Sequence, residues 1–73
     1  MQGLAGEHVQ WYRHHKGEVY GVLCRAFHTE TGERLVIYCS HDGSQIFARP
    51  ADMFFGNAIV SGKLVKRFAP LEQ

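Results

Sequence analysis

Apolar and polar residues alternate along this chain in short segments that are separated by turn residues. The turn signals are Lys16-Gly17, Thr31-Gly32, Asp42-Gly43-Ser44, Arg49-Pro50, Phe55-Gly56-Asn57 and Ser61-Gly62. Between them the chain is rich in β-branched and aromatic residues, and no segment has the period of an amphipathic helix. We therefore expect strands over residues 9–14, 19–28, 34–40, 45–49, 58–60 and 64–68.

One segment departs from this pattern. Pro50 suits the first position of a helix, and the residues that follow it, through Phe54, are enough for a single helical turn. Many short strands in a small chain must curl to cover their apolar face. The predicted fold class is all-β: a small SH3-like barrel of five or six short antiparallel strands, with one short turn of 3₁₀ or α-helix near residues 50–54.

The central hairpin predicts a register and a core face. A turn centred on Glu30-Thr31 pairs His28 with Glu33, Ala26 with Leu35, Cys24 with Ile37 and Val22 with Cys39. Most of these side chains are apolar, so we expect them on the core face. The opposite, outward face would present Leu23, Arg25, Phe27, Arg34, Val36 and Tyr38. In this register Cys24 and Cys39 are diagonal neighbours, too far apart for a disulfide, and are expected to be small core residues.

Length and composition set the organisation of the chain. Its 73 residues, 45% of them apolar, allow one compact core. We expect a flexible N-terminal segment over residues 1–7 and a single domain over residues 8–73. The sequence shows neither a secretion signal nor an apolar run that could span a bilayer, so we expect a cytoplasmic protein without membrane contact, with reduced thiols.

The charge is nearly balanced. Eight Lys and Arg residues stand against seven Asp and Glu residues, which gives a formal net charge of +1. That balance excludes a general electrostatic attraction to nucleic acid or anionic lipid. Any basic surface must be local.

Familiar catalytic and cofactor motifs are missing from the sequence. It contains no GxxxxGK, GxGxxG, HExxH, CxxC or GxSxG pattern, and its five histidines have no metal-ligand spacing. We therefore predict no cofactor and no metal.

Three clusters remain as candidates for chemistry. In Trp11-Tyr12-Arg13-His14-His15-Lys16, aromatic and cationic side chains adjoin, as they do on surfaces that stack bases and neutralise phosphates. An amphipathic strand with Trp11 or Tyr12 in the core, and with Arg13 and Lys16 in solvent, explains the same residues.

The second cluster, residues 28–33, brings an imidazole and two carboxylates to one hairpin tip. His28 could act as a general acid or base that Glu30 or Glu33 orients, and these three are the only catalytic candidates. An ordinary turn with a cross-strand His and Glu pair is the structural alternative.

The third cluster follows the fourth predicted strand. Met53 and Phe54 could cover an open end of the barrel, while Arg49 could contact Asp52 or reach an anionic ligand.

Residues from all parts of the chain carry a resemblance. They are Tyr12-Arg13-His14-His15-Lys16-Gly17, Val19-Tyr20, Val22-Leu23, Ala26, His28-Thr29-Glu30-Thr31, Leu35-Val36, Tyr38, Arg49-Pro50, Met53-Phe54, Gly62 and Arg67-Phe68. In this order they resemble the bacterial domain-of-unknown-function family 1653. The resemblance implies a stand-alone bacterial protein with an SH3-like barrel and brings no established activity. Phe47-Ala48, where the family usually has Trp and Val, and Gly56-Asn57, where it tends to be acidic, depart from it.

Our leading hypothesis is a non-catalytic binding module that uses an aromatic and basic surface. Its ligand could be a peptide, a nucleotide or single-stranded nucleic acid. The predicted binding residues are Tyr12, Arg13, His14, Lys16, His28, Glu30, Tyr38 and Arg49, with Phe27 and Arg34 beside them. The alternatives are a small hydrolase or transferase that uses His28, and a structural domain that forms a homodimer through the outer hairpin face.

Overall fold

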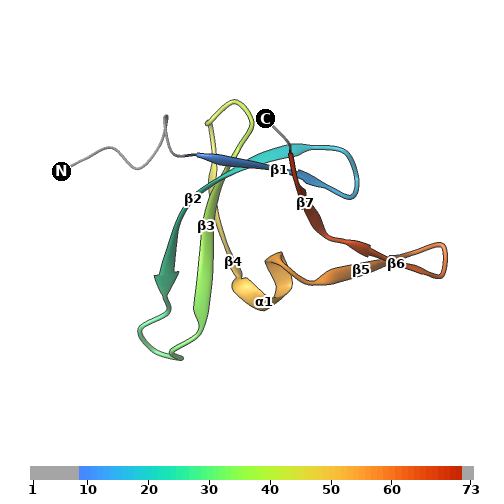
Figure 1. Cartoon of the computed structure of the whole chain (residues 1–73). Coiled ribbons are helices and arrows are strands. Elements are labelled where there is room, and N and C mark those ends of the chain that lie inside the picture. Colours follow the sequence, from blue (N-terminus) through green and yellow to red (C-terminus); the bar gives the residue numbers. More distant parts are fainter. Residues whose placement is uncertain (1–8, 72–73) are drawn as a thin grey trace.

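Short antiparallel strands make up most of the structure, a computed structural model that describes residues 9–71 (Figure 1). In chain order its elements are β1 (Gln10–His14), β2 (Val19–Phe27), β3 (Arg34–Ser40), β4 (Ile46–Pro50), α1 (Ala51–Phe54), β5 (Asn57–Val60), β6 (Lys63–Lys66) and β7 (Phe68–Pro70). The all-β class and the helical turn after Pro50 are confirmed. The segment 1–7, predicted to be flexible, lies outside the described residues.

The strands form a curled sheet and a separate hairpin. The sheet has the order β4-β3-β2-β1-β7, and β5 pairs only with β6. The sheet curls so far that Arg49 of one edge strand, β4, lies 5.6 Å from the ring centroid of Phe68 on the other edge strand, β7. In the part of the chain described, side chains rather than a backbone ladder therefore span the gap between the two edges. No described helix is long and apolar enough to cross a membrane.

The predicted register of the central hairpin holds near the turn and fails further away. Ala26 pairs with Leu35 and Cys24 with Ile37, as expected. A β-bulge between Val22 and Cys24 then shifts the pairing, so that Val22 faces Tyr38 and not Cys39. A bulge places one extra residue on its strand, and a turn signal cannot reveal it. Both cysteines are free, with Cys39 buried and Cys24 half-buried.

The predicted core face of the hairpin is wrong. Val36 is 0% exposed and Tyr38 5%, although both were assigned to the outer face, while Leu35 and Ile37 are only half-buried. Both faces of β3 are apolar. The alternation of side chains along the strand therefore shows that every second residue is buried, but it does not show which of the two faces is the buried one. Because Val36 and Tyr38 are buried, they cannot contribute to the dimer interface that we expected on the outer face of the hairpin. The homodimer itself stays a prediction.

The core is predominantly aromatic. Phe54 of α1 stacks on Phe68 of β7, with ring centroids 4.0 Å apart and an interplanar angle of 5°. Tyr38 meets both rings at an angle, at 5.1 and 5.7 Å. Phe54 thus covers the curled sheet as expected, whereas Met53, the other residue assigned to this role, is 47% exposed.

Asp42 organises the turn between β3 and β4. Its carboxylate accepts hydrogen bonds from the Ser44 N–H at 3.0 Å and from the Ser44 and Ser40 hydroxyls at 2.8 Å. Because these bonds favour the charged form, led by the backbone bond from Ser44, they lower the pKa of Asp42 from 3.8 to about 2. Gly43, with φ 77°, supplies the left-handed residue that this turn needs.

This turn makes stability depend on pH in a defined window. A carboxyl whose folded-state pKa is lowered stabilises the fold above its unfolded pKa of 3.8, and that stability is lost as pH falls towards about 2. Asp42→Asn removes the charge, so urea unfolding should show the variant less stable than wild type at neutral pH, with the difference shrinking over this window. Asp52→Asn is the control with the same charge change. A difference for Asp42→Asn that stays constant down to the acid limit would contradict this assignment.

The aromatic core predicts a contrast between two phenylalanines. Phe54→Ala should lower the free energy of unfolding by about 3–5 kcal/mol, the cost typical of truncating a fully buried ring. Phe27 is 63% exposed, and Arg34 lies over its ring at 5.4 Å, so Phe27→Ala should cost less than about 1 kcal/mol. Urea titrations measure both, with Phe54→Leu as a milder variant if Phe54→Ala does not fold. Equal losses at the two positions would refute the assignment of the core.

Candidate functional site

The predicted binding residues lie at three separate places. Tyr12, His14, Tyr38 and Arg49 pack around the core rings of Phe54 and Phe68. Arg13 and Lys16 are exposed at the β1–β2 hairpin, and His28 and Glu30 are exposed at the tip of the β2–β3 hairpin. The eight residues therefore do not form one patch.

Tyr38 and Arg49 form a structural pair. The Arg49 Nε donates a hydrogen bond of 3.1 Å to the buried Tyr38 hydroxyl, and the guanidinium lies over Phe68. These contacts anchor β4 to the core, and they differ from the predicted contact of Arg49 with Asp52.

The first cluster divides between the two faces of β1. Tyr12 packs against Phe54, at 5.3 Å between ring centroids. Trp11 covers Gly21 on the other side, where an added Cβ would lie 2.9 Å from the Trp11 ring. Arg13 and Lys16 are exposed, as expected of an amphipathic strand.

The second cluster forms an ordinary turn. The Nδ1 of His28 accepts a hydrogen bond from the Glu30 N–H at 3.2 Å, and the His28 N–H donates to the Glu33 carbonyl at 2.8 Å. The three catalytic candidates, His28, Glu30 and Glu33, are all exposed. Within residues 9–71, no group of three or more His, Cys, Asp or Glu side chains could hold a metal ion.

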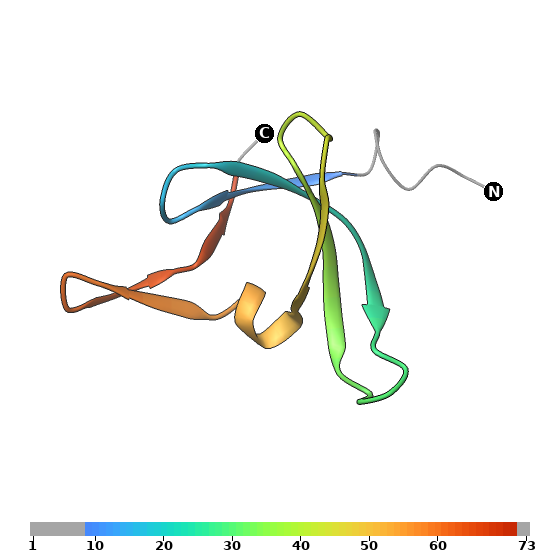
Figure 2. The same cartoon turned by 180° about the vertical axis from the view of Figure 1, so that it is seen from behind.

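A groove of about 390 Å³ separates the β1–β2 hairpin from the β5–β6 hairpin. Both hairpins extend to the same side of the molecule (Figures 1 and 2). We call it the basic groove; its lining residues are Arg13, His14, His15, Gly17, Val60, Val65, Lys66 and Ala69. All of its ionisable lining residues are basic.

The positive potential of this groove acts on His14. Partial burial lowers the pKa of His14 from its ordinary 6.5, and the charges of His15, Arg49, Lys16 and Arg67 lower it further. His14 is therefore mainly neutral at pH 7. Its Nδ1 accepts a hydrogen bond from the Lys16 N–H at 3.1 Å, which assigns the proton of the neutral ring to Nε2.

Arg67 fixes the far wall of the basic groove. Its Nε and Nη2 donate to the carbonyls of Met53 and Asn57, at 3.1 and 3.2 Å. Its carbonyl accepts a hydrogen bond from the His15 N–H at 2.9 Å. The base of the β5–β6 hairpin is thereby tied to both α1 and β1.

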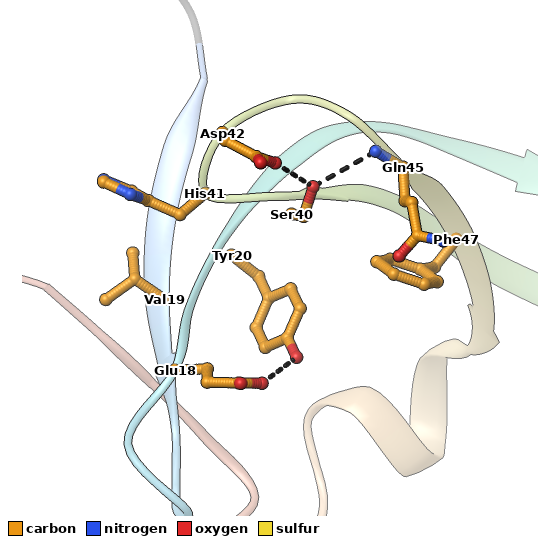
Figure 3. Close-up of a pocket in the computed structure, with 8 residues that line it drawn as sticks. All are labelled: Glu18, Val19, Tyr20, Ser40, His41, Asp42, Gln45 and Phe47. Atoms are coloured by element: carbon orange, nitrogen blue, oxygen red, sulfur yellow. Dashed lines mark hydrogen bonds between the residues drawn. The ribbon is translucent and has the colours of Figure 1, made fainter.

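A second hollow, of about 500 Å³, lies at the opposite end of β2 from the β2–β3 turn (Figure 3). We call it the aromatic cleft; its lining residues are Glu18, Val19, Tyr20, Ser40, His41, Asp42, Gln45 and Phe47. The Tyr20 hydroxyl donates to Glu18 at 2.7 Å, and this bond is the main reason that the pKa of Tyr20 is raised. The rings of Tyr20 and Phe47 meet at 77°, with centroids 6.0 Å apart.

Sequence reasoning missed most residues of both hollows. His15 and Lys66 of the basic groove lie 51 positions apart in the chain and come together because β1 pairs with β7, where His14 faces Phe68. The cations Lys63, Lys66 and Arg67 were a local signal in the sequence. The aromatic cleft is lined by residues at the β1–β2 turn and at the β3–β4 turn. These turns are far apart in the sequence, so the cleft could be recognised only from the structure.

Comparisons with known proteins identify the family and nothing more specific. No curated protein matched the chain, and no solved structure did. The family model described as "Protein of unknown function (DUF1653)" matches residues 10–70. That range begins with the first residue of β1 and ends with the last residue of β7. The chain therefore belongs to the DUF1653 family of proteins of unknown function.

Proposed function

We propose that this protein is a non-catalytic binding domain whose basic groove takes single-stranded nucleic acid. The observation that carries the proposal is the lining of the groove: among residues 9–71 it holds the cations Arg13 and Lys66 and the imidazoles of His14 and His15, and no carboxylate. Phosphate groups are bound by such clusters, and an open groove suits an extended strand. Of the ligand classes considered from the sequence, this one fits the groove better than a peptide or a single nucleotide.

The distribution of charge supports an anionic ligand despite the net charge of only +1. Lys16 and Arg67 adjoin lining residues in the chain, and Lys63 pairs with the lining residue Val60 across the β5–β6 hairpin, so all three add to the positive potential. The acidic side chains Glu30, Glu33, Asp42 and Asp52 belong to the other turns and to α1. Glu18 follows Gly17 of the groove but accepts the hydrogen bond from Tyr20.

The groove also offers surfaces for bases. The rings of His14 and His15 lie with centroids 4.3 Å apart and are tilted by 32°. Histidine rings are among the side chains on which unstacked bases pack. Val60 and Val65, which project from the same face of the β5–β6 hairpin, form an apolar wall. Phosphate contacts and apolar contacts are thus available together.

We do not extend the proposal to a reaction. His28, Glu30 and Glu33 are exposed at a turn whose hydrogen bonds they help to make, and general acid–base chemistry usually needs a more enclosed site. We infer that binding takes place in the bacterial cytoplasm. The free thiols of Cys24 and Cys39 are consistent with that reducing compartment.

The proposal predicts a salt-dependent affinity. Binding of an oligodeoxythymidine of about 16 nucleotides can be measured by fluorescence anisotropy. The logarithm of the association constant should fall linearly with the logarithm of the salt concentration, with a slope of about −2 to −3 for about three to four neutralised phosphates. Arg13→Gln and Lys66→Gln should each weaken binding and reduce the slope by about 0.7, the contribution of one phosphate contact to a single strand.

The matched control is Arg34→Gln, which removes the same kind of charge at the start of β3. It should leave the slope unchanged. Binding that is absent at low salt, or that Arg34→Gln weakens as much as Arg13→Gln does, would sink the proposal.

A further inference from the structure

The aromatic cleft differs from the basic groove in every property that selects a ligand. Among the described residues, its ionisable side chains besides Tyr20 are the carboxylates of Glu18 and Asp42 and the imidazole of His41, and neither Lys nor Arg lines it. We propose that the aromatic cleft binds an alkylammonium group, such as a lysine side chain or a free amine. This site is distinct from the nucleic-acid groove and does not depend on it.

The walls of the cleft are suited to a cation. The rings of Tyr20 and Phe47 both line the cleft and stand nearly perpendicular to each other, in an edge-to-face contact (Figure 3). The face of an aromatic ring carries negative potential and attracts alkylammonium groups. The parts of the two rings that line the cleft can therefore contact one such group.

The carboxylates supply the opposite charge. Tyr20 directs its hydroxyl to one oxygen of Glu18, which orients the Glu18 side chain beside the Tyr20 ring (Figure 3). The hydrogen bonds from Ser40 and Ser44 keep Asp42 ionised, with a pKa of about 2. An ammonium group bound in the cleft against these rings would find a fixed carboxylate next to an aromatic wall.

Arg49, the cation whose charge acts on Tyr20, is engaged elsewhere. The charge of Arg49 lowers the pKa of Tyr20, although the hydrogen bond to Glu18 outweighs it. Arg49 donates to Tyr38 and lies over Phe68, and neither residue lines the cleft. The cleft, of about 500 Å³, has room for an alkyl chain, and the Gln45 side chain adds a polar group to its rim.

The test is a titration of the isotopically labelled protein with n-butylammonium chloride, followed by backbone amide NMR shifts. We expect saturable shifts at Tyr20, Gln45 and Phe47, with a Kd of about 1 mM. The uncharged isostere 1-butanol should not produce them. Glu18→Gln should raise the Kd about fivefold, whereas Glu30→Gln, the same change at the opposite turn, should leave it unaltered.

A second pair of variants tests the aromatic wall. Phe47→Leu should also raise the Kd about fivefold, whereas Phe27→Leu should not. Replacing butylammonium by Nα-acetyl-lysine-N-methylamide identifies the source: tighter binding of the blocked lysine favours a protein side chain, and weaker binding favours a free amine. The proposal is overturned if no cation gives saturable shifts, if 1-butanol shifts the same amides equally, or if Glu18→Gln and Glu30→Gln have the same effect.

Discussion

The stacking of Phe54 on Phe68 is the contact on which the rest of the structure depends. It joins the short helix α1 to the last strand, and Tyr38 packs against both rings from the centre of the sheet. A chain of 73 residues has few large side chains to bury, so one aromatic cluster must hold both edges of the sheet. Of the residues between Phe54 and Phe68, Phe55 packs against the Phe54 ring at 5.0 Å, and none is among the buried core residues. They form the β5–β6 hairpin, which extends away from the core (Figure 2).

Turn chemistry and strand composition were enough to predict most of the fold. The strands through β4, the helical turn after Pro50 and the pairing of Ala26 with Leu35 all follow from local signals. The buried face of β3 could not be predicted from local signals. It is set by the bulge near Leu23 and by the aromatic partners from α1 and β7. The break before Phe68, which separates β7 from β6, was also missed, because it depends on pairing with β1.

The candidate sites were less accessible to sequence reasoning than the fold. Arg13 and His14 were found because they stand in a dense local cluster, yet Lys66 joins them only through the pairing of β1 with β7. Tyr38 and Arg49 were chosen for their chemistry, and the structure uses that chemistry to hold its own core. Tyr20 and Phe47 were interpreted as strand residues, because nothing local shows that two distant turns will meet beside them.

The net charge is only +1, yet the protein has two hollows whose charged lining residues have opposite signs. The β1–β2 turn separates them: Gly17 lines the basic groove, and the next residue, Glu18, lines the aromatic cleft. The hydrogen bond from Tyr20 orients Glu18 within the aromatic cleft, so its charge is directed to one side of the turn. Arg13 donates to the Gly17 carbonyl at 3.0 Å and so holds its guanidinium against the same turn from the groove side. The hydrogen bonds of Arg13 and Tyr20 thus direct two opposite charges to the two sides of one turn, which is why the basic groove and the aromatic cleft have linings of opposite charge although they meet at consecutive residues.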